Sequence, residues 1–433
     1  MSDIKKLTRL IKELKDQVGV CTRCGTCQAF CPLFAQTGRE ADVARGKLAL
    51  LDGLMEEMFK DPKGVFERLS RCLLCGSCEV NCPRGVNILE IFIKARTIIG
   101  TYIGLSPVKK LILRKVLACP ERFDHIAEWT CRKQNLLAKP VERLGNISCS
   151  GFVSTLAANR HFKQVAPVPF HRMLPALNSS PGASGIKVGF FVGCLIDKVY
   201  PHIAQASIDV LHHHGVGVFM PGGQGCCGIP SVSSGDMLSF KKLVCYNLEK
   251  FESVDFDYLV TPCATCTFTI KKIWPMMFQS DSAKIKERIQ RIATKTLDIS
   301  QFLSANIGLK TKEIKKEDQV VSVTYHDPCH LKKSLGVFAE PRELIKASPR
   351  YRLKEMPEAD WCCGMGGIFN LRHYDISTEI GKRKTENIKS TGCPVVATGC
   401  PACMIQISDM LSNSGNHITV KHTIELYADS IRG

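Results

Sequence analysis

Eight cysteines in the N-terminal part of the chain form two runs with the same spacing. Each run reads C-x2-C-x2-C-x3-C-P, and a proline, Pro32 or Pro83, follows its last cysteine. Thiolates this close together can wrap one loop around a metal centre, so that several of them reach it at once. The candidate ligands are Cys21, Cys24, Cys27 and Cys31 in the first run and Cys72, Cys75, Cys78 and Cys82 in the second.

This spacing is typical of bacterial ferredoxins, which bind a pair of [4Fe–4S] clusters. In that pattern the fourth cysteine of each run points away from its own loop and ligates the other cluster. We therefore expect one cluster on Cys21, Cys24, Cys27 and Cys82, and the other on Cys72, Cys75, Cys78 and Cys31. Zinc also accepts four thiolates, but zinc sites rarely use two such dense runs, each followed by proline.

A second set of ten cysteines forms an internal repeat. The first copy contains Cys194, Cys226, Cys227, Cys263 and Cys266, and the second contains Cys329, Cys362, Cys363, Cys400 and Cys403. Corresponding cysteines are separated by 135, 136, 136, 137 and 137 residues. An offset this constant indicates two tandem copies of one domain.

Each copy offers five thiols, one more than a cubane uses. A Cys-Cys-Gly triplet places two of them at a tight turn, which Gly228 or Gly364 allows. A C-x2-C pair and one distant cysteine supply the others. The fifth thiolate can be spare, can distort a cluster or can bridge irons. Zinc and a redox-active disulfide remain alternatives to iron in these copies.

The elements around these cysteines predict a parallel sheet in each copy. Apolar runs that read as strands precede the cysteines, at residues 188–192, 216–220 and 258–261 in the first copy and at 320–325 and 395–398 in the second. Helical segments between them give a βαβαβ unit. The cysteines then follow strand ends, at the edge where α/β domains place their sites and where helix N-termini favour an anionic centre.

The remaining segments are predicted to be mainly helical. We expect helices at 43–58 and 88–99 beside the N-terminal cysteines, a helix from Pro107 to about residue 118, and a helix over 283–302 that links the two copies. The expected fold class is α+β and multidomain. Its parts are an α-helical ferredoxin-type domain for two [4Fe–4S] clusters (1–100), a basic helical connector (101–185) and two tandem α/β cysteine-rich domains with parallel sheets (186–310 and 311–433).

Composition narrows the classes of protein. With 45% hydrophobic and 23% charged residues the chain is of ordinary globular type. The N-terminus has no apolar signal core, and no stretch offers the run of about 20 apolar residues that a membrane span needs. An odd total of 23 cysteines in a reducing compartment favours metal binding over disulfides. We expect a cytoplasmic protein that associates peripherally with the inner face of the cell membrane.

The positive charge is unevenly distributed. Residues 101–180 carry 12 basic and 4 acidic side chains, net +8 of the +17 of the whole chain. Interleaved aromatics or a nucleic-acid-binding motif would be needed for a nucleic-acid partner, and neither is found. The bases at positions 109, 110, 114 and 115 therefore predict docking on an acidic partner or on anionic lipid, with a solvated surface as the alternative.

Other site motifs do not indicate a further cofactor. The one G-x-G-x-x-G match, at residues 223–228, belongs to the loop of the first Cys-Cys-Gly triplet, and no P-loop pattern occurs. No nucleotide or flavin site beyond the metal ligands is therefore predicted, and the catalytic residues are unknown. His326 and His330 flank Cys329. They could donate hydrogen bonds to cluster sulfur and tune its potential, or could be structural.

Two motifs carry a resemblance to a known family. Residues 325–331 read Tyr-His-Asp-Pro-Cys-His-Leu and residues 359–367 read Ala-Asp-Trp-Cys-Cys-Gly-Met-Gly-Gly. With the cysteine layout, they resemble the iron–sulfur subunit of the glycolate oxidase and lactate dehydrogenase group, in which a double-cubane ferredoxin domain precedes two CCG domains. A related component of heterodisulfide reductase has the same layout, and its CCG domains carry noncubane [4Fe–4S] clusters held by five cysteines. Many glycolate and lactate subunits lack a cysteine in the first copy, whereas this chain keeps all ten.

The resemblance implies an oxidoreductase subunit that transfers electrons. It would pass them from a FAD-containing dehydrogenase subunit that oxidises a 2-hydroxy acid, glycolate or lactate, to a quinone or another carrier. Hydride removal is a two-electron step, so the flavin is expected on the partner only. The cofactors expected here are two [4Fe–4S] clusters and one or two further clusters, cubane or noncubane, in the CCG domains. The alternatives are a heterodisulfide-reductase-like subunit that reduces a disulfide at these clusters, and a zinc-bearing scaffold.

Overall fold

The computed structural model describes residues 7, 10–137, 139–141, 147–149, 160–309 and 320–432. The chain forms two units. The first unit comprises Met1–Ala118, Gly228–Lys242 and Gly364–Ile380, and the second comprises Cys119–Cys227, Leu243–Cys363 and Gly381–Gly433. The predicted connector lies partly outside the described residues, and so does the predicted boundary at 310/311. The four predicted domain ranges stay a prediction.

The N-terminal part of the first unit is helical. Its elements are η1 (Lys12–Leu14), α2 (Lys15–Gly19), α3 (Cys27–Phe30), α4 (Pro32–Thr37), η2 (Glu40–Asp42), α5 (Ala44–Met55), α6 (Pro62–Ser70), α7 (Ser77–Val80), α8 (Ile88–Ile103), α9 (Pro107–Lys110) and η3 (Leu111–Leu117). The helices predicted at 43–58 and 88–99 are confirmed as α5 and α8. Helix α5 buries Leu48, Leu51 and Leu54 at helical spacing. Gly104 follows the last residue of α8, and its φ of 75° suits glycine.

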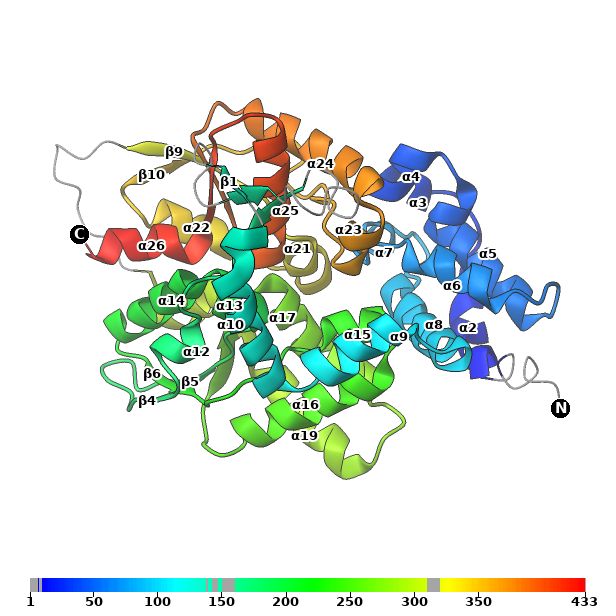
Figure 1. Cartoon of the computed structure of the whole chain (residues 1–433), viewed down its shortest axis with the longest axis horizontal. Coiled ribbons are helices and arrows are strands. Elements are labelled where there is room, and N and C mark those ends of the chain that lie inside the picture. The colour runs from blue at the N-terminus through cyan, green and yellow to red at the C-terminus, as the bar shows by residue number, and fades with distance from the viewer. Residues whose placement is uncertain are drawn as a thin grey trace. The chain divides into compact units, whose positions relative to one another are not determined.

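The first unit also includes the segment that follows each Cys-Cys-Gly triplet. Helix α15 (Ile229–Ser233) comes from the first copy and packs on α8, and α23 (Ile368–Arg372) comes from the second (Figure 1). A Cβ built on Gly235 would lie 2.6 Å from the carbonyl oxygen of Arg96 in α8. The backbones therefore approach so closely that only glycine fits at this position.

The first sheet of the second unit has five strands in the order β4-β6-β5-β7-β8. Strands β5, β6, β7 and β8 are parallel, and β4 pairs with β6 in the antiparallel direction. The bounds are β4 (Leu177–Asn178), β5 (Lys187–Phe190), β6 (Gly217–Met220), β7 (Tyr258–Thr261) and β8 (Thr296–Asp298). Its helices are α13 (Cys194–Val199), α14 (Pro201–His213), α16 (Met237–Phe251), α17 (Ala264–Phe268), η5 (Thr269–Ile273), α18 (Trp274–Met277), α19 (Ala283–Lys295), α20 (Ile299–Phe302) and η6 (Leu303–Ile307).

The second sheet repeats this arrangement with four parallel strands in the order β10-β9-β11-β12. The bounds are β9 (Val321–Tyr325), β10 (Tyr351–Leu353), β11 (Val395–Thr398) and β12 (Thr419–His422). Its helices are α21 (Cys329–Leu335), α22 (Glu340–Lys346), α24 (Tyr374–Lys389), α25 (Pro401–Asn413) and α26 (Thr423–Arg432). The predicted fold class, α+β with a helical N-terminal domain and two parallel-sheet domains, is confirmed.

One predicted element is wrong. The sequence pattern favoured a single helix over 283–302, but the chain leaves α19 at Lys295, forms β8 and only then enters α20. Thr296, β-branched and fully buried, begins this strand, and Asp298 ends it by capping α20 through the amide of Ser300. Pairing with β7 supplies the backbone hydrogen bonds that a helix would have made.

Between η3 and the first sheet, the chain forms two helices and three short antiparallel strands. They are α10 (Pro120–Leu137), α12 (Phe170–Met173), β1 (Lys139–Val141), β2 (Ile147–Cys149) and β3 (His161–Lys163). Within the described residues, no helix is both long enough and apolar enough to cross a bilayer.

Candidate iron–sulfur centres

The eight N-terminal cysteines are divided between two cavities of the first unit. Cys21, Cys24, Cys27 and Cys82 line one cavity. Cys31, Cys72, Cys75 and Cys78 line the other. Each cavity thus takes three cysteines from one run and the fourth from the other run, which is the grouping that the crossed ligand pattern predicts. Their role as ligands stays a prediction.

Local backbone chemistry explains why Cys31 leaves its own run. Helix α3 ends before Cys31, which adopts an extended backbone (φ −84°, ψ 113°) and caps α4. Its Sγ accepts a hydrogen bond from the amide of Phe34 at 3.4 Å. Pro32 supports this start, because proline suits the first turn of a helix. Burial raises the pKa of the Cys31 thiol to about 12, so deprotonation needs a positive charge such as a metal.

One buried cation lines the cavity of Cys31 and Cys72, and another contacts the backbone of Cys72. Lys47, 1% exposed, lines the cavity and donates to the carbonyl oxygen of Asp42. Arg96, 3% exposed, donates to the carbonyl oxygens of Leu69 and Cys72. Burial lowers the pKa of both cations, while the thiolate of Cys72 raises it. A four-iron cluster with four thiolates is a net anion, so it would neutralise these charges, and the residues fit it.

In the first cysteine-rich copy, the thiols form a chain of pairwise contacts. The Sγ atoms of Cys194 and Cys226 lie 3.7 Å apart. Cys226 also contacts Cys227, and Cys227 contacts Cys266. These hydrogen bonds, followed by burial, raise the pKa of Cys226 and Cys266 well above the usual value. Thiols packed this closely are suited to share a metal centre.

The two copies meet at their C-x2-C pairs. Cys263 contacts Cys400, and the amide of Ala264 donates to the carbonyl oxygen of Gly399 at 3.0 Å. In the second copy Cys400 contacts Cys403, whose Sγ lies 3.5 Å from that of Cys363. Cys266 also contacts Cys263, so sulfur contacts run without a break from one copy into the other. Cys329 is the first residue of α21 and is half-buried. Cys362, the residue before Cys363, is buried.

The two histidines beside Cys329 have different surroundings. His330 contacts the hydroxyl of Thr265 through Nδ1 at 3.2 Å and stacks on Phe268, with ring centroids 4.5 Å apart. His326 is 1% exposed, and its Nδ1 contacts the carbonyl oxygen of Ala359 at 3.1 Å. Burial lowers the pKa of His326 to about 3. A neutral ring carries one N–H hydrogen, and Nδ1 donates it to the carbonyl oxygen of Ala359. The predicted hydrogen bond from His326 to cluster sulfur therefore does not fit.

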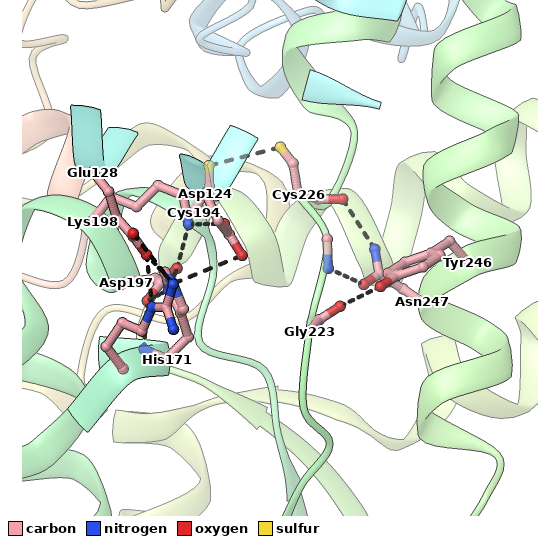
Figure 2. A network of polar contacts seen from close by, with 12 residues as sticks. Asp124, Glu128, His171, Cys194, Asp197, Lys198, Gly223, Cys226, Tyr246 and Asn247 are labelled. Atoms are coloured by element: carbon pink, nitrogen blue, oxygen red, sulfur yellow. Dashed lines mark hydrogen bonds and ion pairs between the residues drawn. The ribbon is translucent and has the colours of Figure 1, made fainter. Parts of the chain in front are cut away.

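A polar network lies beside Cys194 and Cys226 (Figure 2). His171 contacts Asp197 through its backbone amide, at 2.8 Å, and through Nδ1, at 2.9 Å. Lys198 forms an ion pair with Asp124, at 2.6 Å. The hydrogen bond to Asp197 raises the pKa of His171. The cavity that these residues share with the two cysteines can therefore supply a proton.

Three buried cations near the cysteines could not be identified from the sequence. They are Lys47, Arg96 and Lys384, and no spacing pattern relates them to a cluster. Lys384 is 1% exposed and donates to the carbonyl oxygen of Ala359, and burial lowers its pKa to about 8 while Cys363 raises it. A buried lysine within a long amphipathic helix looks like any surface lysine in the sequence.

Comparisons with known proteins agree with this architecture. The family described as "4Fe-4S dicluster domain" matches residues 17–86, and the family described as "Cysteine-rich domain" matches residues 188–271 and 323–408. A crystal structure of a hypothetical protein from Helicobacter pylori covers 100% of this chain and 77% of that chain, with a TM-score of 0.55 and 10% identity. That likeness supports the fold alone.

Curated relatives cover nearly the whole chain or a little over half of it. The probable glycolate oxidase iron–sulfur subunit of Bacillus subtilis is 28% identical over 95% of this chain and 94% of its own length. A component of the fumarate reductase (CoM/CoB) of Methanothermobacter marburgensis is 28% identical over 94% of this chain and 71% of its own length. Lactate utilization protein A of Bacillus subtilis is 30% identical over 56% of this chain and 98% of its own length.

These matches, together with the cysteine layout, support an iron–sulfur electron-transfer role within an oxidoreductase. The resemblance predicted from the motifs is thereby confirmed. The chain belongs to the family of iron–sulfur proteins that includes the glycolate oxidase iron–sulfur subunit and lactate utilization protein A.

Proposed function

We propose that this chain is the iron–sulfur subunit of a flavin-dependent 2-hydroxy acid dehydrogenase. Electrons from glycolate or lactate would reach it from a FAD-containing partner subunit and leave for a quinone or another carrier. When bound, the clusters supply one-electron storage at each site. The observation that carries the proposal is the unbroken series of sulfur contacts through both cysteine-rich copies, from Cys194 to Cys363.

The chain's own residues would hold and tune these centres. The eight N-terminal cysteines would hold two cubanes, and the ten repeated cysteines would hold the further clusters. Lys47 and Arg96 would balance the negative charge of one cubane. Lys384 would do so in the second copy. The one G-x-G-x-x-G match in the sequence, at residues 223–228, is the loop of a Cys-Cys-Gly triplet, so hydride abstraction is assigned to the partner subunit.

The test is anaerobic purification of the chain with its native partner, followed by iron and flavin analysis. We expect an iron content per chain clearly above the count of about 8 that two cubanes need. We also expect one flavin on the partner subunit. Adding lactate or glycolate should bleach the iron–sulfur absorbance only when the flavoprotein is present. Bleaching of the isolated chain by either acid, or full activity with about 8 irons, would contradict the proposal.

Disulfide reduction is the second candidate, and the cavity beside Cys194 favours it. Cleaving a disulfide to two thiols consumes two electrons and two protons, and His171 lies beside that cavity with a raised pKa. In the His171→Asn variant, disulfide reduction should slow and its pH profile should change, while electron transfer from the flavoprotein continues. Absence of any disulfide-dependent oxidation of the reduced protein would exclude this candidate.

A further inference from the structure

His326 occupies a fixed place at the carboxyl edge of the second sheet. It follows β9 directly, and its backbone amide donates to the carbonyl oxygen of Ala397 in β11 at 2.9 Å. The side chain is 1% exposed. Neighbouring strands therefore hold the ring at the edge where the cysteines of this copy also lie.

The hydrogen bond of the ring determines which nitrogen can bind a metal. Nδ1 lies 3.1 Å from the carbonyl oxygen of Ala359, and a carbonyl oxygen only accepts, so Nδ1 carries the hydrogen. A doubly protonated, charged ring would be costly at this burial. Nε2 therefore presents a lone pair. It is buried, and among the described residues it has no hydrogen-bond partner.

The surroundings of His326 are those of a metal ligand. One ring nitrogen of His326 and the Sγ atoms of Cys363 and Cys403 all lie within 4.8 Å of one another. Imidazole and thiolate both suit iron. Metal-bound histidines usually donate their other ring hydrogen to a carbonyl or carboxylate, as Nδ1 does here.

The first copy has no counterpart to this ligand. At the offset of 135 residues that relates Cys194 to Cys329, His326 corresponds to Phe191. Phe191 also follows its strand directly, is 0% exposed and stacks on Phe251, with ring centroids 5.9 Å apart. Phenylalanine offers no donor atom, so the two copies differ in chemistry at equivalent positions.

We propose that Nε2 of His326 is a ligand to iron in the second cysteine-rich domain, which makes this site a mixed nitrogen and sulfur centre. At the equivalent position of the first copy, Phe191 offers no ligand atom. The inference rests on the proposed function, because it requires a cluster in the second copy. A neutral imidazole ligand gives an iron–sulfur centre a higher potential than a thiolate at the same place. A thiolate at position 326 should therefore lower the potential of this centre.

The experiment uses anaerobically purified holoprotein from cells grown with ¹⁵N-histidine or with unlabelled histidine. Pulsed EPR of the paramagnetic state should show the coupling of a directly bound nitrogen, and labelling should change that coupling. The coupling should vanish in His326→Phe and persist in the matched control His330→Gln, because the contacts described for His330 go to Thr265 and Phe268. In His326→Cys the iron content should be kept, the nitrogen coupling lost and the midpoint potential lowered.

Iron analysis separates the two ways to fail. A content of about 8 irons, as two cubanes need, would refute the cluster in the cysteine-rich domains and the ligand with it. A higher content without any histidine coupling in the labelled native protein would overturn the ligand alone. That measurement requires no variant, so misfolding of His326→Phe cannot obscure it. Persistence of the coupling in His326→Phe or His326→Cys would equally overturn it.

Discussion

Cys31 shares its cavity with three cysteines of the other run, at positions 72, 75 and 78. We predict that Cys31→Ser damages the cluster of that second run, because this cavity would lose its fourth thiolate. EPR and Mössbauer spectra of the variant should show one altered cluster and one unchanged cluster. The matched control is Cys82→Ser, which should alter the other cluster. Damage to the cluster of Cys21 and Cys24 in the Cys31→Ser protein would refute the crossed arrangement.

Among single elements, the helical segment after Pro107 combines exposed apolar and basic side chains. Leu111 and Ile112 are 59% and 52% exposed, and Lys110 and Lys115 are exposed beside them. A base near an anionic lipid surface contributes about 1 kcal/mol. We predict that Lys110→Gln with Lys115→Gln releases the protein from membranes, or from its flavoprotein, at moderate salt. Fractionation at graded salt measures this, and unchanged fractionation together with unchanged complex assembly would leave only a solvated surface.

The other two bases of this segment have contacts within the first unit. Arg114 forms an ion pair with Asp236 at 3.1 Å, and the side chain of Asp236 is 0% exposed. Lys109 is partly buried, which lowers its pKa to about 8. We predict that Arg114→Gln lowers the free energy of unfolding by about 1–3 kcal/mol, because a buried carboxylate loses its charged partner. Denaturant titration measures this, with the Lys110→Gln, Lys115→Gln protein as the control that should be unchanged.

Across the whole molecule, each repeat contributes its post-triplet segment to the first unit, together with the ferredoxin-like helices. Gly235 lies in such a segment with a φ of 84°, and an added Cβ would meet the carbonyl oxygen of Arg96. We predict that Gly235→Ala destabilises the first unit by more than the roughly 1–2 kcal/mol of left-handed strain alone. Gly38→Ala is the control, since Gly38 has a φ of 60° and nothing within 4 Å of an added Cβ. Equal losses in thermal unfolding would show that the close packing contributes nothing.

Much of this architecture could be predicted from local patterns. The cysteine spacings indicated the clusters and the repeat, because ligands within one loop are close in the sequence as well as in space. The strands at 258–261 and 395–398 have the predicted bounds, since each is a short apolar run that ends at a cysteine motif. The helix predicted at 43–58 is α5, which buries apolar residues at helical spacing. Such signals need only neighbouring residues.

Only the tertiary structure could decide contacts between distant residues. Arg114 and Asp236 are 122 residues apart, and no pattern in either segment indicates that they pair. Strand β8 forms because β7 offers it a free edge, which overrides the local helical pattern. His326 could be noted beside Cys329, but its tautomer depends on the carbonyl oxygen of Ala359, 33 residues away. The sequence thus determined which residues could bind metal, whereas long-range packing decided which of them meet, how each is charged and which lone pair remains for a metal.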